Sequence, residues 1–286
     1  MSFEQSNAIE FDLSLIHQLT KEDGAHWQPV SVTRFKKANK ELFYLNAHHG
    51  TGSDFVNKTF LVTRLAFYTL SLKFAVLEYD ETQRDQIVTL AREHEKSDFF
   101  QASEPIFAAH LAMEKQIPFK GGEPSDRYMF SEMEKHGYSP DDIIGLHFLT
   151  AIRQMQRDGS FDEDQLSEYA RYIFTQKRQA AGITHGNGMN SLEEFEQWYA
   201  AYNTTGKHYS KISDFDVAPV KTTETSYFRD INRALGLIRE PHIDTVIEES
   251  LSMHDSVLVV YGGGHLTQSR PVFEKAFGPG TVLKLT

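Results

Sequence analysis

The feature that most constrains the fold is an alternation of short apolar runs with segments of helical spacing. Runs typical of strands occupy residues 29–36, 41–49, 74–80, 117–124, 255–266 and 281–285. Apolar residues three and four positions apart, or an amphipathic composition, predict helices at 55–72, 82–94, 104–116 and 239–251. Strands that alternate with helices predict an α/β fold with a central mixed sheet flanked by helices.

The segment from about 125 to 215 has a different pattern, dominated by helices. Its longest helix is predicted to begin after Ser139, with Pro140 in its first turn, and to end at Gly159. No linker rich in proline or serine brackets this segment. We therefore interpret it as a large helical insertion that forms one wall of a cleft in a single domain spanning 1–286.

Composition excludes several classes of function. The chain has no cysteine, which rules out disulfides, a thiol nucleophile and zinc sites built from cysteine, so a metal site must use histidine and carboxylates. The net charge is −11 and the bases form no cluster, which argues against a nucleic-acid partner. No apolar stretch approaches the ~20 residues of a membrane span, and the first residues lack the pattern of a secretory signal. We expect a cytoplasmic protein without a membrane partner, and the sequence indicates no oligomeric state.

Four of the predicted strands end in residues that can take part in chemistry. In open α/β sheets, ligands bind where the carboxyl ends of parallel strands meet. The residues at these ends are Asn46, His48 and His49; Glu78 and Asp80; Glu123; and Gly262, Gly263, Gly264 and His265. Because they would meet at one edge of the sheet, this edge is the candidate site.

These residue types suit the activation of water. Two imidazoles and a carboxylate are a common ligand set for a divalent ion such as Mn, Co or Zn, which turns bound water into a nucleophile. Without a metal, one histidine would act as a general base, oriented by Glu78. Glycines let the backbone approach a ligand, and the N–H groups of Gly263 and Gly264 would stabilise a developing anion. The alternative is structural, with Glu78 capping the next helix and the histidines ending strands.

Other motifs do not fit. The stretch HGTGSD at 49–54 lacks the G-K-[ST] ending of a phosphate-binding loop and does not match G-x-G-x-x-G. The serine-hydrolase motif G-x-S-x-G is absent.

The strand ends resemble motifs of the superfamily of erythromycin esterase, ChaN and TraB–Tiki proteins. Asn46-Ala47-His48-His49 lies where that family has its first glycine- and histidine-containing motif. Glu78 matches the glutamate after the next strand, and Arg239 matches an arginine before an amphipathic helix. Gly262-Gly263-Gly264-His265 matches the second motif. The resemblance covers about residues 40–125 and 225–286.

The resemblance implies several activities. Tiki-like members are similar to metal-dependent peptidases, esterase members hydrolyse lactones, and ChaN-like members are linked to haem or iron. Asn46 stands where the family has glycine or glutamate, which argues against lactone chemistry. The resemblance assigns His49 to the site, and strand alternation then turns His48 to the other face unless it is an additional ligand.

We therefore expect a hydrolase that acts on a peptide, ester or amide bond of a small-molecule or peptide substrate. Water would be activated at His49, Glu78 and His265, which would also be the ligands of a divalent metal. The residues expected to bind substrate are Glu123, Arg239, Gly263 and Gly264. The alternatives are a haem-, iron- or ligand-binding protein on the same scaffold and a catalytically inactive relative.

Overall fold

The computed structural model describes residues 9–20, 22–23, 29–48, 54–93, 103–183, 188–219 and 226–285. Contacts divide the chain into two compact units. The sheet unit comprises Met1–Gln18, Glu22–Glu123 and Glu240–Thr286, and the helical unit comprises Leu19–Lys21 and Pro124–Arg239. The helical insertion expected at about 125 to 215 lies in the helical unit, which continues to Arg239.

The described part of the sheet unit contains one sheet with the strand order β4-β3-β5-β2-β1-β6. The strands are β1 Ser31–Lys37, β2 Lys40–Ala47, β3 Phe74–Asp80, β4 Phe119–Glu123, β5 Ser256–Gly262 and β6 Thr281–Leu283. β2, β5, β3 and β4 run parallel to one another, whereas β1 is antiparallel to both of its neighbours. The predicted α/β fold with a mixed sheet is therefore confirmed.

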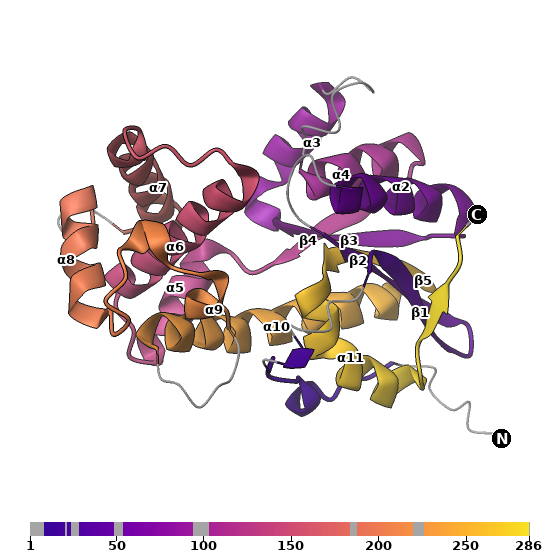
Figure 1. The fold of residues 1–286 in the computed structure, drawn as a ribbon. Helices are drawn as coiled ribbons and strands as arrows, with labels where there is room; N and C mark the ends of the chain where they lie inside the picture. The colour runs from indigo at the N-terminus through magenta and orange to yellow at the C-terminus, as the bar shows by residue number, and fades with distance from the viewer. Residues whose placement is uncertain are drawn as a thin grey trace. The chain divides into compact units, whose positions relative to one another are not determined.

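Helices cover both faces of this sheet (Figure 1). The helices are α2 Asp54–Thr69, α3 Arg84–Glu93, α4 Glu104–Glu114, α10 Tyr227–Met253 and α11 Gly263–Phe277, with short 3-10 helices η1 Leu13–Leu15 and η2 Glu81–Gln83. One core cluster joins α2, α3 and α4 to Leu258 and Val260 of β5. The other joins α11 and the later part of α10 to Val257, Val259 and Tyr261. Alternate residues of β5 thus serve opposite faces, as the two-residue period of a strand requires.

Two consecutive glycines are part of a strand within the predicted run 117–124. Gly121 and Gly122 lie inside β4. A side chain at Gly121 would overlap the carbonyl oxygen of Tyr79, and one at Gly122 would overlap the hydroxyl of Tyr261. The glycines therefore make room for Tyr79 of the adjacent strand β3 and for the buried side chain of Tyr261 of β5.

The helical unit has its own core. It contains α5 Asp126–Lys135, α6 Pro140–Asp158, α7 Leu166–Ala181, α8 Leu192–Tyr202, η4 Tyr209–Lys211, α9 Asp214–Val217 and the first part of α10. α6 has the predicted ends, because Ser139 and Asp142 form a capping box and Gly159 adopts a left-handed conformation with φ of 70°. Phe148 packs edge-on against Phe174 and Phe195 in the centre of this core.

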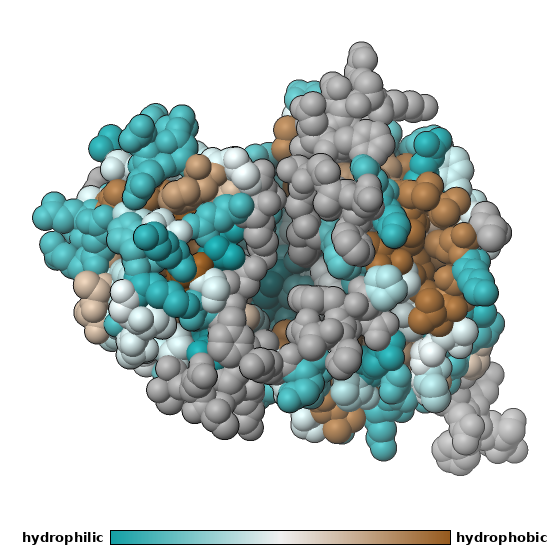
Figure 2. All heavy atoms as spheres, in the orientation of Figure 1, coloured by the Kyte–Doolittle hydropathy of each residue, from teal (hydrophilic) through white to brown (hydrophobic). Residues whose placement is uncertain are grey.

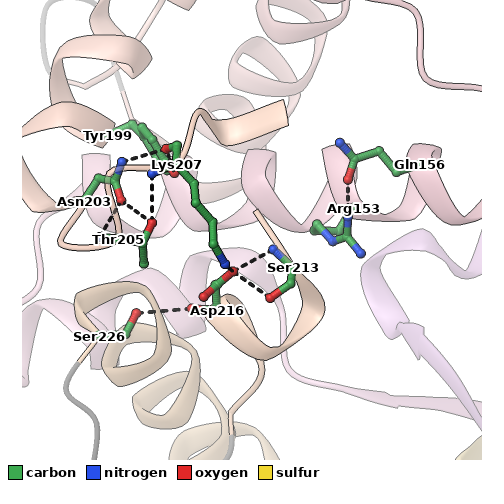
Figure 3. A network of polar contacts seen from close by, with 9 residues as sticks. All are labelled: Arg153, Gln156, Tyr199, Asn203, Thr205, Lys207, Ser213, Asp216 and Ser226. Carbon is green, nitrogen blue, oxygen red and sulfur yellow. Dashed lines mark hydrogen bonds and ion pairs between the residues drawn. The ribbon is translucent and has the colours of Figure 1, made fainter. Parts of the chain in front are cut away.

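A polar network fixes the less regular part of the helical unit (Figure 3). The Tyr199 hydroxyl and the Asn203 amide both donate to the Lys207 carbonyl at 2.8 Å. Nζ of Lys207 lies 2.9 Å from Oδ2 of Asp216. The same oxygen accepts hydrogen bonds from the backbone N–H and the hydroxyl of Ser213. Hydrogen bonds thus hold the segment from Asn203 to Asp216, where regular structure is sparse.

The surface of the sheet unit carries some hydrophobic residues. Figure 2 shows them gathered over α2 and the nearby edge of the sheet. Among the exposed large hydrophobic residues, α2 contributes Leu61 and β6 contributes Val282. Exposed residues of this kind are normal on globular proteins, so buried polar groups are more informative about a site. Among the helices described, none has the length and apolar character needed to cross a membrane.

Candidate functional site

The chain reverses its direction of winding between β3 and β5. From β3 it passes through α3 and α4 on one face of the sheet to β4, and from β5 it passes through α11 on the other face towards β6. The segments that follow the two neighbouring strands therefore diverge. In parallel sheets this arrangement opens a crevice at the carboxyl ends of the two strands. Glu78 lies near the end of β3 and Gly262 ends β5.

An irregularity in β3 places Glu78. Leu77 pairs with Gly121 of β4 and Asp80 pairs with Glu123, so β3 uses one residue more than β4 over this stretch. Such a bulge commonly re-aims side chains beside functional sites. Here the bulge lies where Glu78 of β3 and Glu123 of β4 come together.

Glu78, Glu123 and His265 form a cluster of ligand type. One ligand atom from each lies within 4.8 Å of the other two. The side chain of Glu78 is 15% exposed and that of His265 is 11% exposed. Three different elements supply them, namely β3, β4 and α11. A divalent ion would take two carboxylate oxygens and one imidazole nitrogen here, which leaves coordination positions for water or substrate.

A buried carboxylate orients the imidazole of His265. Nδ1 lies 2.7 Å from Oε1 of Glu240 on α10, and Nε2 lies 3.5 Å from Oε1 of Glu78. The ring of Tyr261 meets the imidazole edge-on at 5.4 Å between centroids. The two carboxylates thus lie at opposite nitrogens of the ring. Nδ1 is held by Glu240, and Nε2 faces the cluster.

The glycines form the junction between β5 and α11. The N–H of Gly262 donates to Oε2 of Glu78 at 2.9 Å. A side chain at Gly263 would overlap Oδ1 of the buried Asn46. Gly263 and Gly264 are the first two residues of α11, whose N-cap Gly262 makes no side-chain cap. The first N–H groups of a helix lack partners within it and favour negative charge nearby, which suits the carboxylate of Glu78.

Asp244 is a second buried acid, one helical turn after Glu240. Its side chain is fully buried, and neither carboxyl oxygen makes a hydrogen bond of ordinary geometry to a residue that the structure describes. Burial raises its pKa to about 8, against the opposing effect of the nearby Ser269 hydroxyl, and Glu240 raises the pKa further. Asp244 is therefore protonated at neutral pH.

His242 also lies near the cluster. Burial lowers its pKa, while the charges of Glu123, Glu249 and Asp80 oppose that effect. It is half-buried, and its electrostatic coupling to Glu123 brings another imidazole into the neighbourhood of the candidate ligands.

The structure brings some of the predicted site residues together. Glu78, Glu123 and His265 meet, with Gly263 and Gly264 beside them. His49 lies outside the described residues. The backbone N–H of His48 donates to the Thr59 hydroxyl of α2 at 2.9 Å.

Arg239 is the last residue of the helical unit. Burial lowers the pKa of His147 well below its usual range, and the charges of Lys177 and Arg239 lower it further. The predicted role of Arg239 in binding substrate stays a prediction.

Sequence reasoning missed Glu240, His242 and Asp244. A signal was present, because Glu240, Asp244 and Glu248 recur every four residues on one face of α10. Glu248 accepts the backbone N–H of Phe11 at 2.7 Å, so the face that carries these acids packs inside the sheet unit. Acids at this spacing are usually interpreted as a solvent-exposed face.

The chain matches no protein-family model, no curated protein and no solved structure. The resemblance to the erythromycin esterase, ChaN and TraB–Tiki superfamily therefore stays a prediction that depends on the strand-end motifs.

Proposed function

We propose that the protein is a hydrolase whose water is activated by a divalent metal ion bound to Glu78, Glu123 and His265. The observation that carries the proposal is the convergence of three ligand atoms within 4.8 Å, from three elements, at the carboxyl edge of the parallel strands. A bound ion would lower the pKa of its water towards neutrality and polarise the bond to be cleaved.

The surroundings of His265 favour a small ion over haem. One oxygen of Glu78 lies 3.5 Å from Nε2, the nitrogen through which His265 would bind iron. A porphyrin plane bound to Nε2 would have to cross the place of this carboxylate. A compact ion instead uses the carboxylate as a ligand, and Mn, Co and Zn all accept this mixture of oxygen and nitrogen.

The remaining groups have roles that fit this chemistry. The N–H groups at the start of α11 would stabilise negative charge that develops on the substrate. His49 would add a second imidazole. The bond cleaved would be of the peptide, ester or amide type.

Metal binding is the first test. Protein stripped with chelator is titrated with Mn²⁺, Co²⁺ and Zn²⁺ by calorimetry, for the wild type and for Glu78→Gln, Glu123→Gln, His265→Asn and His49→Ala. We expect one site in the wild type and a loss of affinity of at least tenfold in each of the first three variants. Glu134→Gln and His136→Asn change exposed residues of the helical unit and serve as matched controls. Equal affinity in the wild type and in all three ligand variants would refute the centre.

Turnover is the second test. The metal-loaded wild type is assayed with panels of peptide, ester and lactone substrates, and the active reaction is repeated with Glu78→Gln and Glu134→Gln. We expect hydrolysis that depends on the ion and is lost only in Glu78→Gln. Tight binding of the ion without hydrolysis of any substrate class would instead support a binding protein or an inactive relative.

A further inference from the structure

We propose that Glu240 is a positioning residue that fixes the tautomer and the orientation of His265 for metal binding. This inference depends on the proposed metal centre, and it assigns a role to a residue that does not itself reach the ion. Three observations support it, namely the contact between the two side chains, the burial of Glu240 and its position in the fold.

The contact joins the nitrogen that faces away from the cluster to a carboxylate. Oε1 of Glu240 lies 2.7 Å from Nδ1 of His265, whereas Nε2 faces Glu78. Histidines that bind metals through one nitrogen commonly donate from the other to a carboxylate, which orients the ring and makes the ligand nitrogen more basic. The contact between Glu240 and His265 has this geometry.

The burial of Glu240 is costly without such a partner. The residue is 1% exposed, and Oε2 makes no hydrogen bond within the described part of the chain. A buried carboxylate needs a partner that compensates for the loss of water. A hydrogen bond from His265 provides this for Oε1, and the positive charge of a bound ion would stabilise the carboxylate further through the imidazole.

The frame that holds the pair is well packed. Glu240 lies on α10 and His265 in the first turn of α11, and both helices pack through Ile247, Leu266 and Phe273 into the same core. Protein cores are close-packed and do not deform freely, so the two side chains are held in register.

The first part of the experiment uses metal-free protein labelled with ¹⁵N at histidine. The tautomer of His265 is measured by long-range ¹H–¹⁵N correlation and assigned with His265→Asn. We expect the hydrogen on Nδ1 in the wild type and in Glu240→Gln, whose amide oxygen still accepts a hydrogen bond. In Glu240→Ala the Nε2–H tautomer should appear, because the acceptor is lost.

The second part measures affinity for Mn²⁺, Co²⁺ and Zn²⁺ in the same proteins. We expect a loss of about 10- to 100-fold in Glu240→Gln, which removes the charge, and at least as much in Glu240→Ala. Glu248→Gln is the matched control, because Glu248 lies on the same helix and accepts the backbone N–H of Phe11 instead. It should leave the His265 tautomer and the metal affinity unchanged.

The outcomes separate the two proposals. If the wild type binds an ion and both Glu240 variants bind it equally well, the role of Glu240 is refuted and the metal centre stands. If the wild type binds none of the three ions, the metal centre fails and the role of Glu240 fails with it. If Glu240→Ala does not fold, Glu240→Gln decides the outcome through its metal affinity.

Discussion

The carboxylate of Glu78 accepts a 2.9 Å hydrogen bond from the backbone N–H of Gly262, so the last residue of β5 holds a side chain of β3. This bond gives Glu78 a structural role that is separable from metal binding. The two roles respond differently to substitution.

We predict that Glu78→Ala lowers the free energy of unfolding by about 1–3 kcal/mol, because it leaves the buried N–H of Gly262 without its acceptor. Glu78→Gln should cost less, since its amide oxygen still accepts the bond. Both variants should lose metal affinity. Urea denaturation in the presence of chelator measures the free energy of unfolding, and calorimetry measures the metal affinity. Equal stability of the Ala and Gln variants would contradict the structural role.

The contact between Asn46 and Gly263 gives a second prediction. Gly263→Ala would overlap Oδ1 of Asn46 and should destabilise the protein by about 1–3 kcal/mol. Asn46→Ala removes the overlapping group, so Gly263→Ala should cost much less in that background. A double-mutant cycle by urea denaturation should give a coupling free energy of about 0.5–3 kcal/mol. Strictly additive effects would show that the close approach does not matter.

Asp244 predicts a dependence of stability on pH. Its folded pKa of about 8 lies above its ordinary value of 3.8, so the folded protein holds a proton that the unfolded chain releases as pH rises between these values. This contribution to stability is full below pH 3.8 and decreases as pH rises towards the folded pKa. One such proton changes the free energy of unfolding by about 1.4 kcal/mol per pH unit.

The measurement compares wild type with Asp244→Asn, which mimics the protonated acid. Between about pH 5 and pH 7 the free energy of unfolding of the wild type should fall relative to that of the variant by about 1.4 kcal/mol per pH unit. Asp164→Asn, at an exposed aspartate, is the control and should follow the wild type. Parallel pH curves for wild type and Asp244→Asn would mean that Asp244 ionises normally in the folded state.

Asp216 in the helical unit predicts a dependence of opposite sign. Burial opposes its ionisation, but hydrogen bonds from Ser213 and the charge of Lys207 outweigh burial and lower its pKa below the ordinary 3.8. The stabilisation is therefore present above pH 3.8 and is lost as pH falls through the folded pKa. Asp216→Asn should cost about 1–3 kcal/mol at pH 7, and the difference from wild type should shrink in acid. An unchanged difference from pH 7 down to pH 3 would contradict this role.

Local patterns predicted much of the fold. The run FAVLEYD at 74–80 is β3 from its first residue to its last, and α6 begins and ends at its predicted capping residues. These signals depend on residues that are close together in the sequence, so they can be recognised without knowledge of the fold. The insertion of β5 between β3 and β2 is different, because strand order depends on which apolar faces pack together across the whole domain.

The candidate site was predicted only in part, because some of its residues become neighbours only through packing in the folded domain. Glu78 and Glu123 lie at the ends of strands and His265 follows one, at the carboxyl ends where ligands bind in α/β sheets. Glu240 and Asp244 lie in the middle of a helix, and they are buried only because of what that helix packs against in the folded sheet unit. Helical periodicity alone cannot distinguish an acid that faces a neighbouring helix from one that faces water.

The central position of β5 has a consequence for synthesis of the protein. β5 pairs with β2 on one side and with β3 on the other, and no described ladder joins β2 to β3. While the ribosome is still translating the codons before Ser256, the nascent chain has the segments of two strand pairs, β1–β2 and β3–β4, without the strand that pairs with both. Open strand edges of this kind invite pairing with other chains. The seven residues of β5, which are made after both strand pairs, connect the pairs into one sheet and bring His265 to Glu78.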